Sequence, residues 1–384
     1  MRVCHMRLWL TACLLVGGVL SATPASAHVK WFEAADRYPL RLDLVGSERT
    51  ILWLASSAAA VIALFLAHRV LVSRKWFWTR ALTRVAAGAP TVLAIQAAIG
   101  LVSNAVHPSL LAPNLGLPSG VVGATLAVVQ LLIAVSFITG MAEWLGGLAL
   151  MSLIPVIAVL FSPADALEQI FWAGIGAAVV VIGRDAHRTG LARRWFHRRN
   201  PAWARRAIVM LRAAAGLSLI VVALTEKLWN PDLGRAFLLA HPELNVFQSL
   251  PGMGWFSDDM FVLMAGLAEA AIGAMLISGL APRLVILAMW LPFNLGIPLL
   301  PSQELLGHLP MLGIMYVLLV DGADLVPARP VRVPRVVATS GPARLRHQID
   351  HDVHGGVATG RFLSRNHSTS ANMRERELVA PREE

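Results

Sequence analysis

Long apolar runs recur from Ile51 to Val320, and they restrict the fold of this chain more than any other feature. A helix needs about 20 residues to cross roughly 30 Å of hydrocarbon. Lipid offers no partner to unpaired backbone groups, so such runs form helices. Hydrophobic residues make up 56% of the chain, which excludes an ordinary soluble globular protein. The pattern predicts an all-α polytopic membrane protein of about nine transmembrane helices. The predicted spans are 51–72, 85–106, 119–140, 144–161, 168–183, 207–228, 259–280, 283–300 and 306–321.

Residues 1–27 are typical of a secretory signal peptide, with Arg2 and Arg7 before an apolar stretch and small residues up to Ala27. Cleavage there would make His28 the first residue of the mature chain. A free N-terminal His can chelate copper. The alternative is that His28 is simply the residue that follows the cleavage site and has no role in metal binding.

Both cysteines, Cys4 and Cys13, lie inside the predicted signal peptide. A mature chain without thiols could not use disulfide or thiolate chemistry. The stretch "LTAC" that ends at Cys13 also matches a lipoprotein cleavage site, and lipidation there is the competing interpretation.

The formal charge of +10 resides in particular loops rather than on one nucleic-acid-binding surface. Loops 73–84 and 184–206 are rich in Arg, whereas loops 107–118 and 162–167 contain no Lys or Arg. Basic loops stay in the cytoplasm. We therefore expect a multi-pass protein of the bacterial plasma membrane, with an exported mature N-terminus, a cytoplasmic C-terminus, membrane lipid as partner and no nucleic acid.

The predicted spans contain an internal repeat. Residues 126–185 correspond without gaps to residues 139 positions later, so that "ITGMA" meets "ISGLA"; upstream, a shift of 123 lays "LVSNAVHP" on "LTEKLWNP". Internal duplication is common in membrane bundles. The predicted organisation is a signal peptide 1–27, an exported segment 28–50, an extra helix 51–72, a degenerate four-helix unit 85–185, a basic cytoplasmic loop 186–206, a second four-helix unit 207–324 and a disordered cytoplasmic tail 325–384.

Ionisable residues distinguish the second copy from the first. Glu226 and Lys227 correspond to Ser103 and Asn104, Glu269 to Gln130, and His308 to Gln169. An ionisable residue within a membrane span is costly unless it is paired, so function is the default hypothesis for it. The sequence thus predicts a polar pocket near the exported face of the second unit, beside a first unit without such groups.

Each of these residues also has a purely structural interpretation. Lys227 could extend its ammonium group to the membrane interface, Glu269 could be a protonated contact between helices, and His308 could pair with Glu304 one turn away. Because adjacent helical residues point about 100° apart, we expect one of Glu226 and Lys227 to turn inward and the other to reach the interface. One His without ExxH spacing argues against a metal site.

The second unit resembles the DoxX family. Its first helix ends in the Glu-Lys step at Glu226, and "AEAAIGAMLISGL" (268–280) and "GHLPMLGI" (307–314) extend the resemblance. The family is similar to the small membrane subunit of thiosulfate:quinone oxidoreductases. The resemblance implies a redox-linked membrane subunit that is associated with quinone or with a redox partner protein. It also implies oxidoreductase activity for the complex to which such a subunit belongs.

On that hypothesis, Glu269 accepts a proton and Lys227 anchors a quinone or an anionic group. His308 relays protons at the pocket mouth, and Glu226 orients Lys227 or His308. A non-catalytic scaffold that recruits partner proteins through loop 184–206 and the tail is the alternative, and a small-molecule carrier is a third.

Overall fold

A computed structural model describes most of the helical part of the chain. The described residues are 29–71, 85–183, 201–245, 247–248, 250–295 and 302–321. The predicted signal peptide, His28, most of the basic loop and the tail lie outside them.

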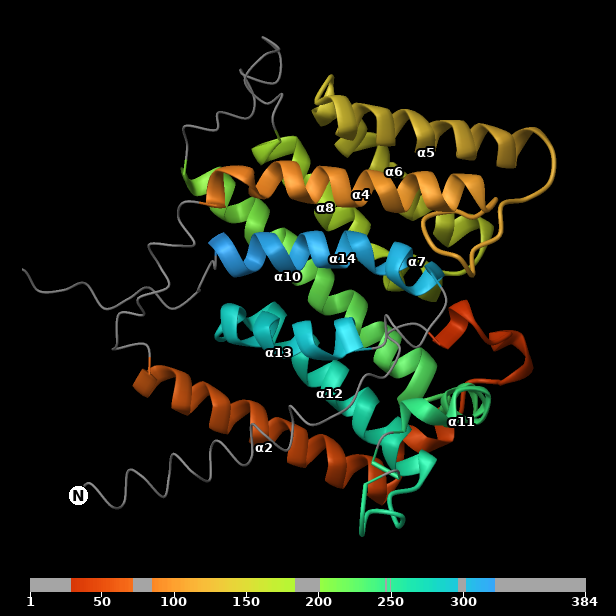
Figure 1. Cartoon of the computed structure of the whole chain (residues 1–384), viewed down its shortest axis with the longest axis vertical. Helices are drawn as coiled ribbons and strands as arrows, with labels where there is room; N and C mark the ends of the chain where they lie inside the picture. The colour runs from red at the N-terminus through yellow and green to blue at the C-terminus, as the bar shows by residue number, and fades with distance from the viewer. Residues whose placement is uncertain are drawn as a thin grey trace, which may run out of the picture. The chain divides into compact units, whose positions relative to one another are not determined.

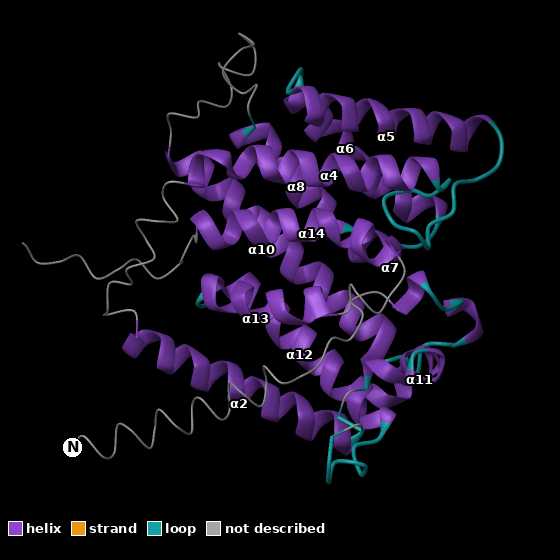
Figure 2. Cartoon of the chain, in the orientation of Figure 1, coloured by secondary structure: helices purple, strands orange, loops and turns teal. Residues whose placement is uncertain are grey.

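Helices form nearly all of the described structure, and no strand occurs in it (Figure 2). They are α2 (Glu48–Leu71), α4 (Ala89–Val106), α5 (Val121–Thr139), α6 (Glu143–Leu160), α7 (Pro163–Glu168), α8 (Ile170–Ile182), α10 (Pro201–Ala223), α11 (Pro231–Ala240), α12 (Asp258–Ser278), α13 (Pro282–Leu295) and α14 (Ser302–Asp321). Among the described helices, five are long and apolar enough to cross a membrane, and parts of α2, α8 and α14 are shorter apolar helices. The prediction of an all-α polytopic membrane protein is confirmed.

The predicted span 168–183 corresponds to α8, and a short helix that was not predicted, α7, precedes it. Ser162 caps α7 by accepting a hydrogen bond from the Asp165 N–H, with Pro163 at the first helical position, so the helix begins before the apolar run. Gln169 interrupts the helix, and α8 follows it. The break leaves Glu168 at the end of α7, buried in the structure.

The helices of the two predicted units exchange partners. The first helix of the first unit, α4, packs on α14, the last helix of the second; α10, the first helix of the second unit, packs on α8, the last of the first (Figure 1). Within each unit, successive helices pack on each other. Two related units with a pseudo-twofold arrangement would show this pattern, although the duplication itself stays a prediction.

The turns after α5 and α12 have the same unusual backbone. Gly140 (φ 72°) and Gly279 (φ 70°) end these helices in the left-handed region, and Ala142 (φ 52°) and Ala281 (φ 43°) follow with positive φ. A positive φ is uncommon outside Gly, so its recurrence 139 positions apart is informative. It supports the proposal that "ITGMA" and "ISGLA" are related.

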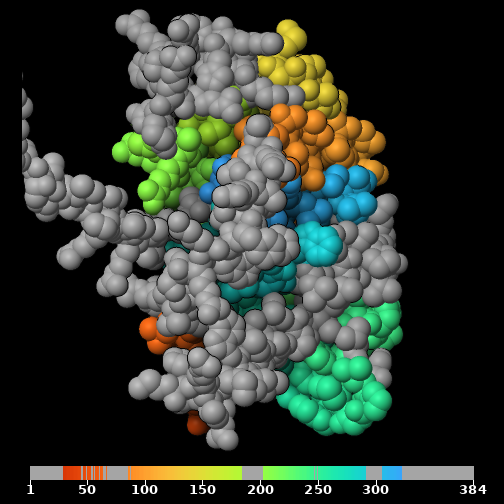
Figure 3. Space-filling view, turned by 60° about the vertical axis from the view of Figure 1, so that its left-hand side comes forward, coloured from red at the N-terminus to blue at the C-terminus, as the bar shows by residue number. Residues whose placement is uncertain are grey.

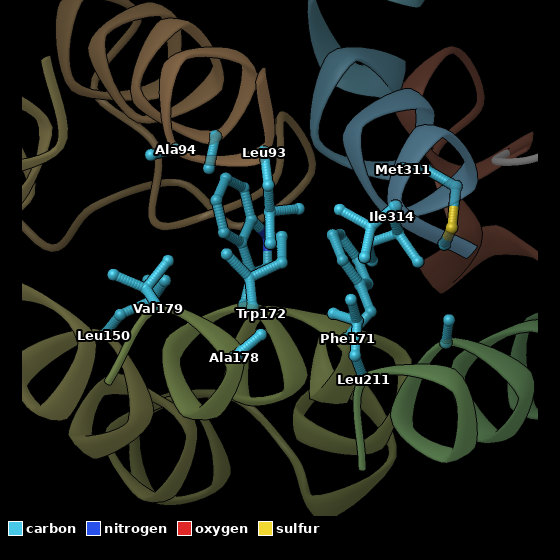
Figure 4. Packing of buried hydrophobic residues seen from close by; sticks show 14 of the residues in the cluster. Leu93, Ala94, Leu150, Phe171, Trp172, Ala178, Val179, Leu211, Met311 and Ile314 are labelled. Carbon is cyan, nitrogen blue, oxygen red and sulfur yellow. The ribbon is translucent and has the colours of Figure 1, made fainter. Parts of the chain in front are cut away.

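One apolar core joins helices from both predicted units. Leu93 of α4, Trp172 of α8 and Ile314 of α14 meet in it (Figure 4). Trp172 also donates its indole N–H to the Leu111 carbonyl at 3.1 Å, which fixes the loop after α4. Gly100 admits the ring of Pro310 beside Trp172, so α4 and α14 approach closely.

A second apolar cluster lies at one end of the bundle, which we call the α11 end. It joins Val29 and Phe32 of the N-terminal segment to Phe237 of α11 and to Phe256 and Phe261 near the start of α12. α11 and the chain after it stand on the molecular surface (Figure 3). The segment predicted to be an exported loop therefore contains a helix, which packs the N-terminal segment against the second unit.

Candidate functional site

The segment "LTEKL" (Leu224–Leu228) ends the first helix of the second unit as a π-helical turn, η5. Single π-helical turns within α-helices are rare, and those that occur are often found at functional sites. Glu226 is 0% exposed and Lys227 3% exposed. The expectation that one of the two reaches the membrane interface is wrong.

Neighbouring elements on several sides of the π turn explain this burial. α10, α11 and α12 all pack against η5. Gly266 of α12 permits the closest approach, since a Cβ atom there would lie 3.0 Å from the Lys227 Cβ. Both side chains consequently point into protein, whichever way the turn directs them.

Lys227 forms an ion pair with Glu269 of α12. Its Nζ lies 2.9 Å from Glu269 Oε2, and the Glu269 side chain is 14% exposed. A buried ammonium group requires such a partner, because either charge alone would be expensive in a membrane helix. The interpretation of Lys227 as an interfacial residue is not what the structure shows.

Glu226 contacts the N-terminal segment. Its Oε2 accepts a hydrogen bond from the Val29 N–H at 2.5 Å. The next residue, Lys30, donates to Glu168 of α7. Two adjacent residues of the N-terminal segment thus contact acidic groups from the two predicted units.

Glu168 is one of the residues that the sequence analysis missed. Thr225 of η5 donates its hydroxyl to Glu168 Oε1 at 2.5 Å, and the Ser218 hydroxyl donates to the Glu168 carbonyl. The first unit is therefore not without ionisable groups at the site. An acidic residue at the boundary of an apolar run was the available signal, but its repeat counterpart is the uncharged Gly307.

His308 of α14 contacts Trp31 of the N-terminal segment. The two rings lie 5.3 Å apart between centroids and are tilted by 43°. Gly307 lies directly under the Trp31 indole, where a side chain would collide with it. His308 is buried and contacts the N-terminal segment at Trp31. Trp31 lies two residues after Val29, which donates its N–H to Glu226.

The predicted first-copy counterpart of Glu269 has a structural role. Gln130 accepts from the Leu111 N–H and donates to the Ser109 carbonyl, both at 2.9 Å. It fixes the loop after α4, in which Leu111 has a φ of 62°. Gln130 thus makes two hydrogen bonds to backbone groups, whereas Glu269 makes an ion pair with Lys227.

The charges around Lys30 determine its protonation state. Burial lowers the pKa of Lys30, but the carboxylates of Glu168, Glu226 and Asp165 together raise it above its usual value. These carboxyl groups therefore favour the charged form of Lys30. We refer to Lys30, Glu168, Thr225, Glu226, Lys227, Glu269, Trp31 and His308 as the polar cluster.

The fold and the polar cluster define a helical membrane protein with buried charges at the α11 end. Comparison with models of protein families, with curated proteins and with solved structures finds no match to this chain. Within the described ranges, no group of three His, Cys, Asp or Glu side chains is placed to hold a metal ion.

Proposed function

We propose that the chain is a redox-linked membrane subunit of the DoxX type, which binds a quinone at the polar cluster. The observation that carries the proposal is the burial of Glu226, Lys227 and His308 at one end of the bundle, with Glu269 paired to Lys227. Buried ionisable groups in membrane spans commonly mark substrate or proton pathways. The arrangement includes a cation, carboxylates and an imidazole beside an indole.

The donor set fits a quinone headgroup. Lys227 can donate to a carbonyl oxygen, and the Trp31 indole beside His308 offers an aromatic face. The redox chemistry, uptake of two electrons and two protons at paired oxygens, would come from the bound quinone. In this proposal Lys227 anchors an oxygen, Glu269 accepts a proton beside it, and His308 passes protons toward the α11 end.

Binding can be measured directly on purified protein. We expect a short-chain quinone to raise the melting temperature of the wild-type protein in detergent, and His308→Gln to reduce that shift, because the variant loses the ring contact that places the Trp31 indole at the site. His241→Gln is the matched control. His241 lies at the same end but packs on Phe237, outside the polar cluster.

A scaffold without a ligand predicts another result. It predicts no quinone-dependent shift in the wild-type protein and no difference between the two histidine variants. That outcome would remove the quinone proposal and leave recruitment of partner proteins, or transport of another small molecule, as the function to test.

We further propose that the α11 end faces the exported side of the bacterial plasma membrane. The loops at this end include 107–118 and 162–167, which contain no Lys or Arg. The opposite end carries the turn between α5 and α6 and the end of α14, after which the tail begins (Figure 1). Basic residues of loops 73–84 and 184–206 would hold that end in the cytoplasm.

Two cysteine variants test this orientation. Met141, after α5, is 71% exposed, and Leu239 of α11 is 70% exposed, so the two sites are matched in accessibility. In whole cells, a membrane-impermeant maleimide is expected to label Leu239→Cys and to spare Met141→Cys until the membrane is opened. The reverse pattern would contradict the proposed orientation.

A further inference from the structure

Lys30 places its ammonium group among carboxylates from both predicted units. It donates to Glu168 and lies 4.0 Å from an Asp165 oxygen, while the preceding residue, Val29, donates its N–H to Glu226. The Lys30 side chain is 13% exposed and that of Glu168 only 2%. A buried carboxyl group is costly to ionise unless a cation lies beside it, and Lys30 supplies a cation directly at Glu168.

Hydroxyl groups fix the carboxylate that receives Lys30. The Thr225 hydroxyl donates to the same Glu168 oxygen, and the Ser218 hydroxyl donates to the Glu168 main-chain carbonyl. Both donors belong to the continuous helix α10–η5, of which α10 packs on α7. The acceptor is thus held in position by groups other than Lys30.

We infer that Glu168, held in place by Thr225 and flanked by Asp165, forms a binding site for a primary ammonium group, and that Lys30 is its tethered ligand. Lys presents a compact point charge with three N–H donors, unlike the planar guanidinium of Arg. The occupied site holds the N-terminal segment so that Trp31 covers His308. Lys30 therefore acts as a latch that keeps Trp31 over His308, whether or not a quinone binds at the polar cluster.

Chemical rescue of a truncated side chain tests this inference. Lys30→Ala removes three methylene groups and the ammonium group, which propylammonium replaces. We expect Lys30→Ala to lower the melting temperature in detergent and propylammonium chloride to restore most of the loss. Tetramethylammonium and guanidinium, at matched ionic strength, are expected to restore little, because one cannot donate hydrogen bonds and the other has the wrong shape.

Two variants control for general effects of amines. Glu168→Gln in the Lys30→Ala background should abolish rescue, because the acceptor charge is gone. Arg235→Ala removes the cation of an ion pair with Asp259 in which both side chains are 45% exposed, so propylammonium should not change its melting temperature. Equal effects on all variants, or an unchanged melting temperature in Lys30→Ala, would overturn the inference.

A folding defect in Lys30→Ala would still give an answer. The variant can then be expressed and extracted with propylammonium present throughout, and folded yield measured by size-exclusion chromatography. Recovery with propylammonium but not with tetramethylammonium supports the ammonium site. No recovery with either, or the same recovery with both, contradicts it. Quinone is absent from every arm, so the result is independent of the proposed function.

Discussion

Glu269→Gln is expected to cost the protein about 3–5 kcal/mol of stability, the usual effect of removing one partner of a buried ion pair. The Lys227 ammonium group, 3% exposed, would be left without its 2.9 Å partner. Gln is nearly isosteric with Glu, so the loss would come from charge rather than from packing. The melting temperature in detergent, followed by circular dichroism, measures the effect.

The double variant Lys227→Met/Glu269→Gln is the decisive comparison. With both charges removed, we expect it to be more stable than either single variant, because no unpaired charge remains. An exposed pair provides the control: Arg235→Gln should change stability by less than about 1 kcal/mol. Additive losses in the double variant would show that Lys227 and Glu269 do not depend on each other.

Gln130→Glu is expected to have the second largest effect, and the effect should depend on pH. A protonated carboxyl group can reproduce both hydrogen bonds of Gln130, accepting from the Leu111 N–H and donating to the Ser109 carbonyl. An ionised carboxylate cannot donate, and its burial without a cation costs several kcal/mol. The variant should approach wild-type stability at acidic pH and lose stability as pH rises above about 4, where Glu ionises in water.

Gln130→Met separates the charge from the lost hydrogen bonds. It has no proton to gain or lose, so its deficit relative to the wild-type protein should be the same at pH 4 and pH 8. Melting curves of the three proteins across this range provide the measurement. A pH-independent deficit in Gln130→Glu would mean that water reaches position 130 and solvates the charge.

The spans were predictable from the sequence because each is a local property of a single apolar run. α5, α6 and α12 begin and end within two residues of the predicted bounds. The short helix α7 before span 168–183 was not predicted, because the Ser162 cap and the interruption at Gln169 act through hydrogen bonds that hydropathy does not register.

The polar cluster was predictable only in part. Glu226, Lys227, Glu269 and His308 were identified because charge within an apolar run is visible locally. Lys30 and Glu168 were missed because their contact joins residues 138 positions apart, and that of Val29 with Glu226 joins residues 197 apart. The burial of both Glu226 and Lys227 also required the π turn and its neighbours, which no periodicity in "LTEKL" reveals.

The position of Trp31 against Gly307 and His308 has a consequence for biogenesis. Val29, Lys30 and Trp31 are synthesised before all the described α-helices, whereas α14 is the last described helix to leave the ribosome. The contact of Trp31 with His308 can form only after α14 has been inserted into the membrane. Before that step, Lys30 can already pair with Glu168 beside the α10–η5 helix. The N-terminal segment can therefore be partly docked before α14 is inserted. Closure of the indole over His308 thus marks the completion of membrane insertion.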